Sequence, residues 1–90
     1  MDFEWDPVKA RANLLKHGVD FAEAAIAVED PCSRHIADPD AEGEERFIAL
    51  GMDGLGRVLL TIYAFRNEHI RVISARKASK DERARYEEYL

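Results

Sequence analysis

The chain has 90 residues, of which 47% are apolar and 34% charged, and its formal net charge at pH 7 is −5. One hydrophobic core usually organises about 100–200 residues, so we expect a single domain over residues 1–90 with no separate cofactor domain. Cys32 is the only cysteine, which excludes an internal disulfide and suits a reducing cytosol. The N-terminus lacks a signal-peptide pattern, and the longest apolar stretch, residues 58–65, is too short to span a bilayer. We therefore expect a cytoplasmic protein without a membrane association.

The charge is unevenly divided along the chain. Residues 1–45 hold 4 Lys or Arg and 12 Asp or Glu, whereas residues 46–90 hold 9 and 6. The acidic total argues against scanning of nucleic acid by a basic surface. The C-terminal half can still form a local phosphate-binding face, because the field depends on where the charges lie.

Two helices are predicted from their end signals. Asp6 is a good N-cap, Pro7 fits the first helical position, and Gly18 favours a left-handed stop. A capping box of Asp20 and Glu23 begins the second helix, which ends before Pro31. Apolar residues at helical spacing mark the faces expected to be buried: Val8, Ala12 and Leu15 in the first helix, and Phe21, Ala24, Ala25 and Val28 in the second.

The period then changes to that of strands. Residues 38–45 are predicted to form an exposed acidic loop, and residues 53–56 a glycine-rich turn. The expected strands are rich in β-branched and aromatic residues and cover residues 33–37, 46–52, 57–65 and 70–75. Together they predict an antiparallel meander of three or four strands.

A last helix is predicted from Ser79, which forms a capping box with Glu82. Tyr86, Tyr89 and Leu90 share one face of it, so we expect the C-terminus to dock on the domain. The predicted fold class is therefore α+β, with two N-terminal helices, an antiparallel sheet of three to four strands and a C-terminal helix.

No motif for a metal, a nucleotide or a nucleophilic serine is present, so we expect no metal and no cofactor. What remains is a cationic series on the last strands and helix: Arg57, Arg66, Arg71, Arg76, Lys77, Lys80, Arg83 and Arg85. Strand alternation places Ile70, Val72, Ser74 and Arg76 on one face and Arg71, Ile73, Ala75 and Lys77 on the other. Guanidinium groups bind phosphate bidentately and stabilise a pentavalent phosphorane.

Plainer interpretations stay open for these residues. Arginines beside a sheet often cover its edge or pair with nearby acids, and Tyr63 and Tyr86 fit core packing. Glu45 with Arg46 fits either a base–cation pair or a salt bridge at the end of a loop. From the residues alone, the sequence indicates a small α+β domain with a basic half.

The chain also resembles a known family, the BrnT toxins, along nearly its whole length. The blocks that carry the resemblance are Phe3-Glu4-Trp5-Asp6-Pro7, Asn13-Leu14, Lys16-His17-Gly18-Val19, Glu44-Glu45-Arg46-Phe47, Gly56-Arg57-Val58-Leu59, Ile70-Arg71-Val72-Ile73-Ser74-Ala75-Arg76-Lys77-Ala78 and Glu82-Arg83. The blocks are specific in combination and in this order.

The resemblance implies a RelE-like fold and the function of a type II toxin, a ribonuclease that arrests translation without a divalent metal. It implies a BrnA-like antitoxin with a ribbon-helix-helix DNA-binding domain, in a hetero-oligomer of two toxins and two antitoxins. Operator DNA is then bound only through the antitoxin complex.

In a metal-free mechanism the RNA 2′-OH attacks the neighbouring phosphorus, which needs proton handlers and cations around the phosphorane. The candidate cations are Arg76, Lys77, Arg66 and Arg83, and the candidate proton handlers are Glu45, His17 and Tyr86. We expect the cations of the last strand and helix to converge on one phosphate.

Two alternatives come from other classes. The chain could be a non-catalytic binding module, the partner and co-repressor of a DNA-binding antitoxin, with the acidic loop 38–45 engaging a basic segment. A minimal nucleic-acid binder is the third, and its affinity would depend steeply on salt.

Overall fold

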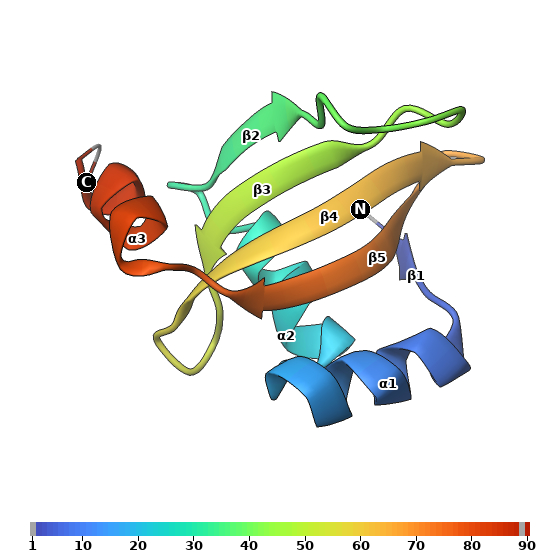
Figure 1. Cartoon of the computed structure of the whole chain (residues 1–90), viewed down its shortest axis with the longest axis horizontal. Helices are drawn as coiled ribbons and strands as arrows, with labels where there is room; N and C mark the ends of the chain where they lie inside the picture. Colours follow the sequence, from blue (N-terminus) through green and yellow to red (C-terminus); the bar gives the residue numbers. More distant parts are fainter. Residues whose placement is uncertain (1, 89) are drawn as a thin grey trace.

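The computed structural model describes residues 2–88 and 90, which form a five-stranded sheet and three helices (Figure 1). In chain order the elements are β1 (Phe3–Glu4), α1 (Pro7–His17), α2 (Phe21–Val28), β2 (Arg34–Ala37), β3 (Phe47–Met52), β4 (Val58–Arg66), β5 (His69–Lys77) and α3 (Lys80–Glu87). Among the described residues, no helix has the length and apolar character needed to cross a bilayer.

The sheet has the strand order β1-β5-β4-β3-β2. Strands β2 to β5 pair antiparallel as predicted, and the β4–β5 turn consists of two residues with positive φ, Asn67 and Glu68. The expected count of three to four antiparallel strands is wrong in one respect. β1 adds a fifth strand that pairs parallel to β5. Two residues are too few to show a period of two, so this strand left no pattern in the sequence.

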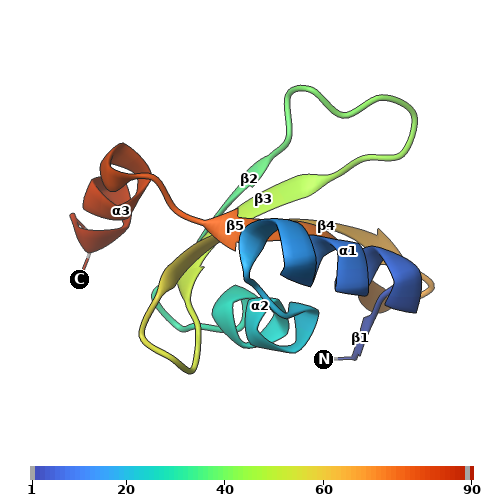
Figure 2. The same ribbon diagram turned by 60° about the horizontal axis from the view of Figure 1, so that its bottom comes forward.

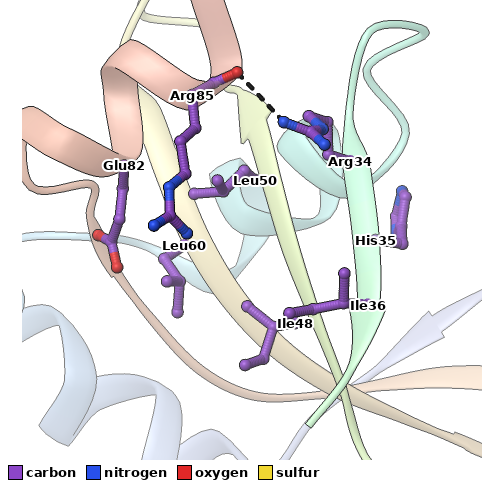
Figure 3. A pocket seen from close by; sticks show the side chains of 8 residues that line it. All are labelled: Arg34, His35, Ile36, Ile48, Leu50, Leu60, Glu82 and Arg85. Atoms are coloured by element: carbon purple, nitrogen blue, oxygen red, sulfur yellow. Dashed lines mark hydrogen bonds between the residues drawn. The ribbon is translucent and has the colours of Figure 1, made fainter.

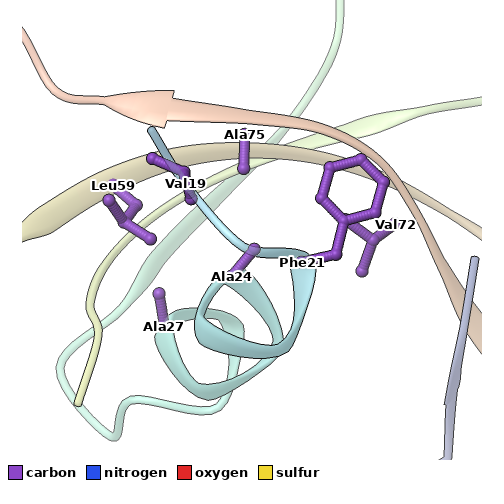
Figure 4. Packing of buried hydrophobic residues seen from close by; sticks show 7 residues of the cluster. All are labelled: Val19, Phe21, Ala24, Ala27, Leu59, Val72 and Ala75. Atoms are coloured by element: carbon purple, nitrogen blue, oxygen red, sulfur yellow. The ribbon is translucent and has the colours of Figure 1, made fainter. Parts of the chain in front are cut away.

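Helices α1 and α2 cover one face of the sheet, and the core lies between the layers (Figures 1 and 4). The main buried cluster joins α2 to the central strands: Val19, Phe21, Ala24, Ala27, Leu59, Val72 and Ala75. Helix α2 lies so close to β3 that a Cβ on Gly51 would stand 2.0 Å from the carbonyl oxygen of Ala27. Only glycine fits at that point of β3, and this close approach sets the spacing of the two layers.

The side of helix α1 that faces the sheet is opposite to the predicted side. Val8 and Leu15 of the predicted buried stripe are 77% and 82% exposed. The buried residue of the helix is Asn13, which lies across the helix axis from that stripe. The caps at Asp6 and Gly18 are as predicted, so the error concerns the face of the helix and not its extent.

Asn13 is buried because its amide completes the edge of β5. Its Nδ2 donates to the carbonyl oxygens of Ala75 (2.8 Å) and Val19 (3.0 Å), and its Oδ1 accepts from the Ala75 N–H (3.1 Å). The side chain thus does for Ala75 what a neighbouring strand would do, beyond the point where the short β1 ends.

A β-bulge in β5 changes which of its side chains point to each face of the sheet. Ile62 pairs with Ser74 and Tyr63 with Val72, so Ile73 has no partner across the β4–β5 pair. The extra residue puts both Val72 and Ala75 in the core, and it turns Arg76 to the uncovered face, which the strict alternation did not predict.

Helix α3 stands at the end of the sheet and is attached through Tyr86 (Figure 1). The predicted capping box of Ser79 and Glu82 is present. Tyr86 is 2% exposed and donates its hydroxyl to Asp30, at the end of α2. Leu90 is exposed, contrary to the expected docking of the C-terminus, and Tyr89 lies outside the described residues.

The Asn13 amide can be tested by substitution. Asn13→Ala leaves the N–H and C=O of Ala75 without partners, and we expect the free energy of unfolding to fall by about 3 kcal/mol. Urea unfolding followed by circular dichroism measures the loss. Lys9→Ala, an exposed change in the same helix, is the control and should cost less than about 0.5 kcal/mol. Equal losses in both variants would mean that the amide does not hold α1 on the sheet.

The attachment of α3 gives a second prediction, for Tyr86→Phe. Partial burial raises the pKa of Asp30, but hydrogen bonds from Tyr86 and from the Met52 and Cys32 N–H groups outweigh it and hold that pKa below 3.8. The variant loses a hydrogen bond to a carboxylate, so unfolding should become easier by about 1.5–3 kcal/mol at neutral pH. The difference should shrink as the pH falls below 3.8 and Asp30 takes up a proton. A difference that is the same at pH 7 and pH 2 in urea unfolding would contradict this.

Candidate functional site

The uncovered face of the sheet holds a groove of about 390 Å³ between β2 and α3 (Figure 3). Its floor is aliphatic and its ends carry charged side chains. The residues that line it are Arg34, His35, Ile36, Ile48, Leu50, Leu60, Glu82 and Arg85. Paired residues of neighbouring strands share a face, and the pairs Arg34–Leu50, Ile36–Ile48 and Leu50–Leu60 therefore put this floor on the side away from α1 and α2.

Two arginines from different elements border the groove. Arg34 begins β2 and donates from Nη1 to the main-chain oxygen of Arg85 in α3, at 3.3 Å. The side chain of Arg85 points between Glu82 and the leucines of the floor (Figure 3). Within the part of the chain that the structure describes, the Arg85 guanidinium forms no ion pair, so it retains its capacity to bind an anion.

A third arginine, Arg76, lies beside the groove and is held by Glu82. Arg76 Nη1 and Nη2 donate to the two carboxylate oxygens of Glu82 at 2.8 and 2.9 Å. The hydrogen bond from Arg76 is the main cause that lowers the pKa of Glu82 to about 2, and the capping bonds at Ser79 add to it. The same pair raises the pKa of Arg76. An anion that binds Arg76 must therefore compete with Glu82.

The cations predicted from the sequence do not converge. Arg66 pairs with His69 at the turn of the β4–β5 hairpin, whereas Arg76 lies seven residues further along β5. At about 3.3 Å per residue, the two are separated by roughly 20 Å. Lys77 pairs with Leu59 and Arg76 with Leu60, so they face opposite sides of the sheet. The expectation of one shared phosphate site for these residues is wrong.

The other predicted site residues are also dispersed. Glu45 is exposed in the loop before β3, and His17 ends α1 on the helix-covered side of β5. Arg83 is exposed on α3, where it faces Glu87 at 4.0 Å. Tyr86 is the buried anchor of α3; burial, together with its bond to Asp30, raises its pKa to about 12. The hydroxyl is thus buried and already donates its hydrogen bond to Asp30.

Much of the cationic series is engaged with acids, as the plainer interpretation predicted. The ion pairs, besides Arg76–Glu82 and Arg83–Glu87, are Arg57–Asp53, Arg66–Glu44 and Arg71–Glu4. These pairs tie turns and the first strand to the sheet. The acidic residues of the chain thus neutralise its arginines locally, and the basic character of the C-terminal half is weaker at the surface than the sequence indicates.

Sequence reasoning missed Arg34 and the second role of Glu82, and it left Arg85 within the general series. Arg34 is separated from Arg85 by 51 positions in the chain, and no spacing rule connects them. The capping box did identify Glu82, since the residue at that position points back to the start of the helix. Because Arg76 lies only three residues before Ser79, it is within reach of the same carboxylate, and the capping box was therefore the signal that could have found the pair.

A second polar cluster lies on the other side of β2. His35 Nε2 lies 2.7 Å from Ser33 Oγ, and His35 Nδ1 lies 2.8 Å from the hydroxyl of Tyr63. Burial lowers the pKa of His35 and raises the pKa of Tyr63. Figure 3 shows the His35 ring turned away from the other side chains of the groove. Both ring nitrogens already have hydroxyl partners, so this cluster fits the packing of β2 on β4.

Over residues 2–88 and 90, no group of three or more His, Cys, Asp or Glu side chains is arranged to hold a metal ion. The chemistry that the groove offers is that of guanidinium groups beside one strongly acidic carboxylate. Such groups bind and stabilise an anion with delocalised charge, and a phosphodiester is an anion of that kind.

The chain is similar to known proteins. Residues 5–82 match the family described as the ribonuclease toxin BrnT of type II toxin–antitoxin systems. The crystal structure of the ribonuclease toxin BrnT from Brucella abortus is similar, with a TM-score of 0.64 and 28% sequence identity. That match covers 89% of this chain and 99% of the Brucella chain. No curated protein matches the chain.

The family match spans α1, α2, strands β2 to β5 and the start of α3, and therefore includes Arg34, Arg76 and Glu82. The chain belongs to the BrnT family of ribonuclease toxins of type II toxin–antitoxin systems.

Proposed function

We propose that the groove on the uncovered face is where this toxin binds and cleaves single-stranded RNA, without a divalent metal. The observation that carries the proposal is that Arg34 and Arg85 line one aliphatic floor, and that Arg76 lies beside it, bound to the lining residue Glu82. Unpaired bases present flat faces that pack on apolar side chains, while their phosphates seek guanidinium groups. The groove offers both kinds of contact within about 390 Å³.

In the proposed reaction the RNA 2′-oxygen attacks the adjacent phosphorus and the bond to the 5′-oxygen breaks, which leaves a 2′,3′-cyclic phosphate. Arg76 and Arg85 bind the phosphate oxygens and stabilise the extra negative charge of the phosphorane. The leaving 5′-oxygen takes a proton from water. No metal ion is needed, because the guanidinium groups supply the positive charge.

Glu82 is the proposed acceptor of the 2′-OH proton. In the free protein the Arg76 ion pair holds the pKa of Glu82 at about 2, which makes it a poor base. A phosphate that binds Arg76 weakens this pair, and the pKa of Glu82 rises toward its ordinary value of 4.5. The carboxylate then becomes a stronger base at the moment when substrate is bound.

The wider role is inferred from the type II toxin family. We propose a RelE-like, one-domain toxin that acts in the cytoplasm and arrests translation by cutting RNA. A BrnA-like ribbon-helix-helix antitoxin neutralises it in a complex of two toxins and two antitoxins, and operator DNA is bound through that complex.

The test is cleavage of a labelled single-stranded RNA by the purified toxin in EDTA. We expect Arg76→Ala and Arg85→Ala each to slow cleavage by about 10- to 100-fold, because each removes a cation that stabilises the phosphorane. Glu82→Gln should slow cleavage as well, and the lost base should flatten the acidic limb of the pH profile. Arg11→Ala, an exposed arginine on the helix-covered side, is the matched control and should cleave at the wild-type rate.

Each outcome decides between mechanisms. Cleavage that needs added Mg²⁺ would contradict the metal-free reaction, and undiminished cleavage by both arginine variants would move the site elsewhere. If the wild type neither cleaves RNA nor arrests growth when expressed alone, the alternative of a non-catalytic partner of a DNA-binding antitoxin is correct for this chain.

A further inference from the structure

Helix α1 presents an apolar stripe that nothing in the described chain covers. Val8 and Leu15 are 77% and 82% exposed, and Ala12 lies between them on the same side of the helix. Figure 2 shows α1 along the outside of the molecule, away from α3. The spacing of i, i+4 and i+7 lines these residues up along the helix axis. Single exposed aliphatic residues are ordinary, but an aligned pair at this exposure marks a contact surface.

The same helix is basic in an acidic protein. Residues 7–17 hold Lys9, Arg11 and Lys16 and none of the chain's 18 Asp and Glu residues. All three cations are exposed. Helical geometry, at 100° per residue, places Lys9 and Lys16 along one side of the apolar stripe and Arg11 along the other. The stripe is thus an aliphatic ridge between two basic borders.

The cause of this arrangement is Asn13. Its three hydrogen bonds to Ala75 and Val19 fix which side of α1 meets the sheet. The more apolar side of the helix therefore faces solvent, and its aliphatic side chains stay exposed in the isolated toxin. A surface of this kind gains in stability only when a second chain covers it.

We propose that the outer face of α1 is the docking surface for the antitoxin, which binds it with an acidic amphipathic helix. The aliphatic ridge packs against apolar residues of the partner helix, and Lys9, Arg11 and Lys16 pair with the carboxylates that flank them. The inference rests on the proposed pairing with an antitoxin and adds the site and the chemistry of the contact.

Charge disfavours a symmetric pair of copies of this chain as the occupant. In a symmetric pair of α1 helices, the lysines and arginine of one copy would face those of the other, and like charges in contact destabilise an interface. An acidic partner has the opposite effect, because the two potentials are complementary and also speed the encounter.

The docking surface is separate from the groove. α1 covers one face of the sheet (Figure 2). The residues of the groove lie on the other face, so both surfaces can be occupied at the same time. Binding to α1 holds the antitoxin in place whether or not RNA fills the groove. A further segment of the antitoxin is then free to reach around the sheet and block the arginines.

The experiment measures binding of the toxin to the purified product of the reading frame adjacent to its own gene. We expect the double variant Val8→Glu/Leu15→Glu to raise Kd by about tenfold or more, because it puts carboxylates on the ridge. Leu55→Glu is the matched control, since Leu55 is 70% exposed on the β3–β4 turn and does not belong to the stripe on α1. Its Kd should stay within about twofold of wild type. Wild-type Kd should also rise with salt.

A second variant guards against a folding defect. Lys9→Glu/Lys16→Glu changes only exposed charges, should melt like the wild type, and should also raise Kd by about tenfold. Normal antitoxin binding by both double variants overturns the proposal. So does α1-dependent binding of the free toxin to itself or to anionic phosphatidylserine vesicles. RNA cleavage measured on the same samples separates this result from the groove: the α1 variants should cleave normally, and the binding result holds even if the wild type does not cleave.

Discussion

The amide of Asn13 determines how the two layers of this protein meet. Strand β5 is paired on its outer side only at Ile70 and Arg71, because β1 is two residues long. Beyond that point its edge would expose unpaired peptide groups. One buried side chain satisfies both peptide groups of Ala75 and also binds Val19, the residue that leads into α2. The edge of the sheet and the position of both helices therefore depend on the same three hydrogen bonds.

That constraint explains why the caps of the helices could be predicted and the face of α1 could not. Capping depends on neighbours in the chain, and Asp6 and Ser79 act as the sequence indicates. Asp20 also caps its helix, but the predicted capping box with Glu23 is not formed, because Glu23 accepts from the Gly54 N–H instead. The facing of α1 depends on a partner 62 positions away. A stripe of Val8, Ala12 and Leu15 predicts burial but does not tell whether the burying surface is the protein's own sheet or another molecule. Asn13 was visible only as part of a family motif.

The site shows the same division between local and distant information. The Arg76–Glu82 pair spans six residues and is connected to a capping box, but the facing of Arg76 depends on the bulge at Ile73, which strict alternation does not include. Arg34 and Arg85 meet only because Tyr86 attaches α3 to Asp30, across 56 positions. Composition predicted a basic half, whereas ion pairs engage most of its arginines in the folded chain, Arg76 beside the groove among them.

In this acidic chain most arginines form ion pairs with its own carboxylates, so positive charge is available to a ligand only at a few places on the surface. Arg57, Arg66 and Arg71 serve the turns and the sheet edge, so the net negative charge of the chain opposes the approach of a polyanion, most strongly at low salt. In the proposed mechanism, affinity for RNA comes from short-range contacts in the groove, where a phosphate displaces Glu82 from Arg76. The same exchange strengthens Glu82 as a base. In that mechanism, the net charge and the paired arginines weaken the general attraction for RNA, and the Arg76–Glu82 pair couples phosphate binding to activation of the base. Both effects favour a toxin that acts only on RNA correctly seated in its site.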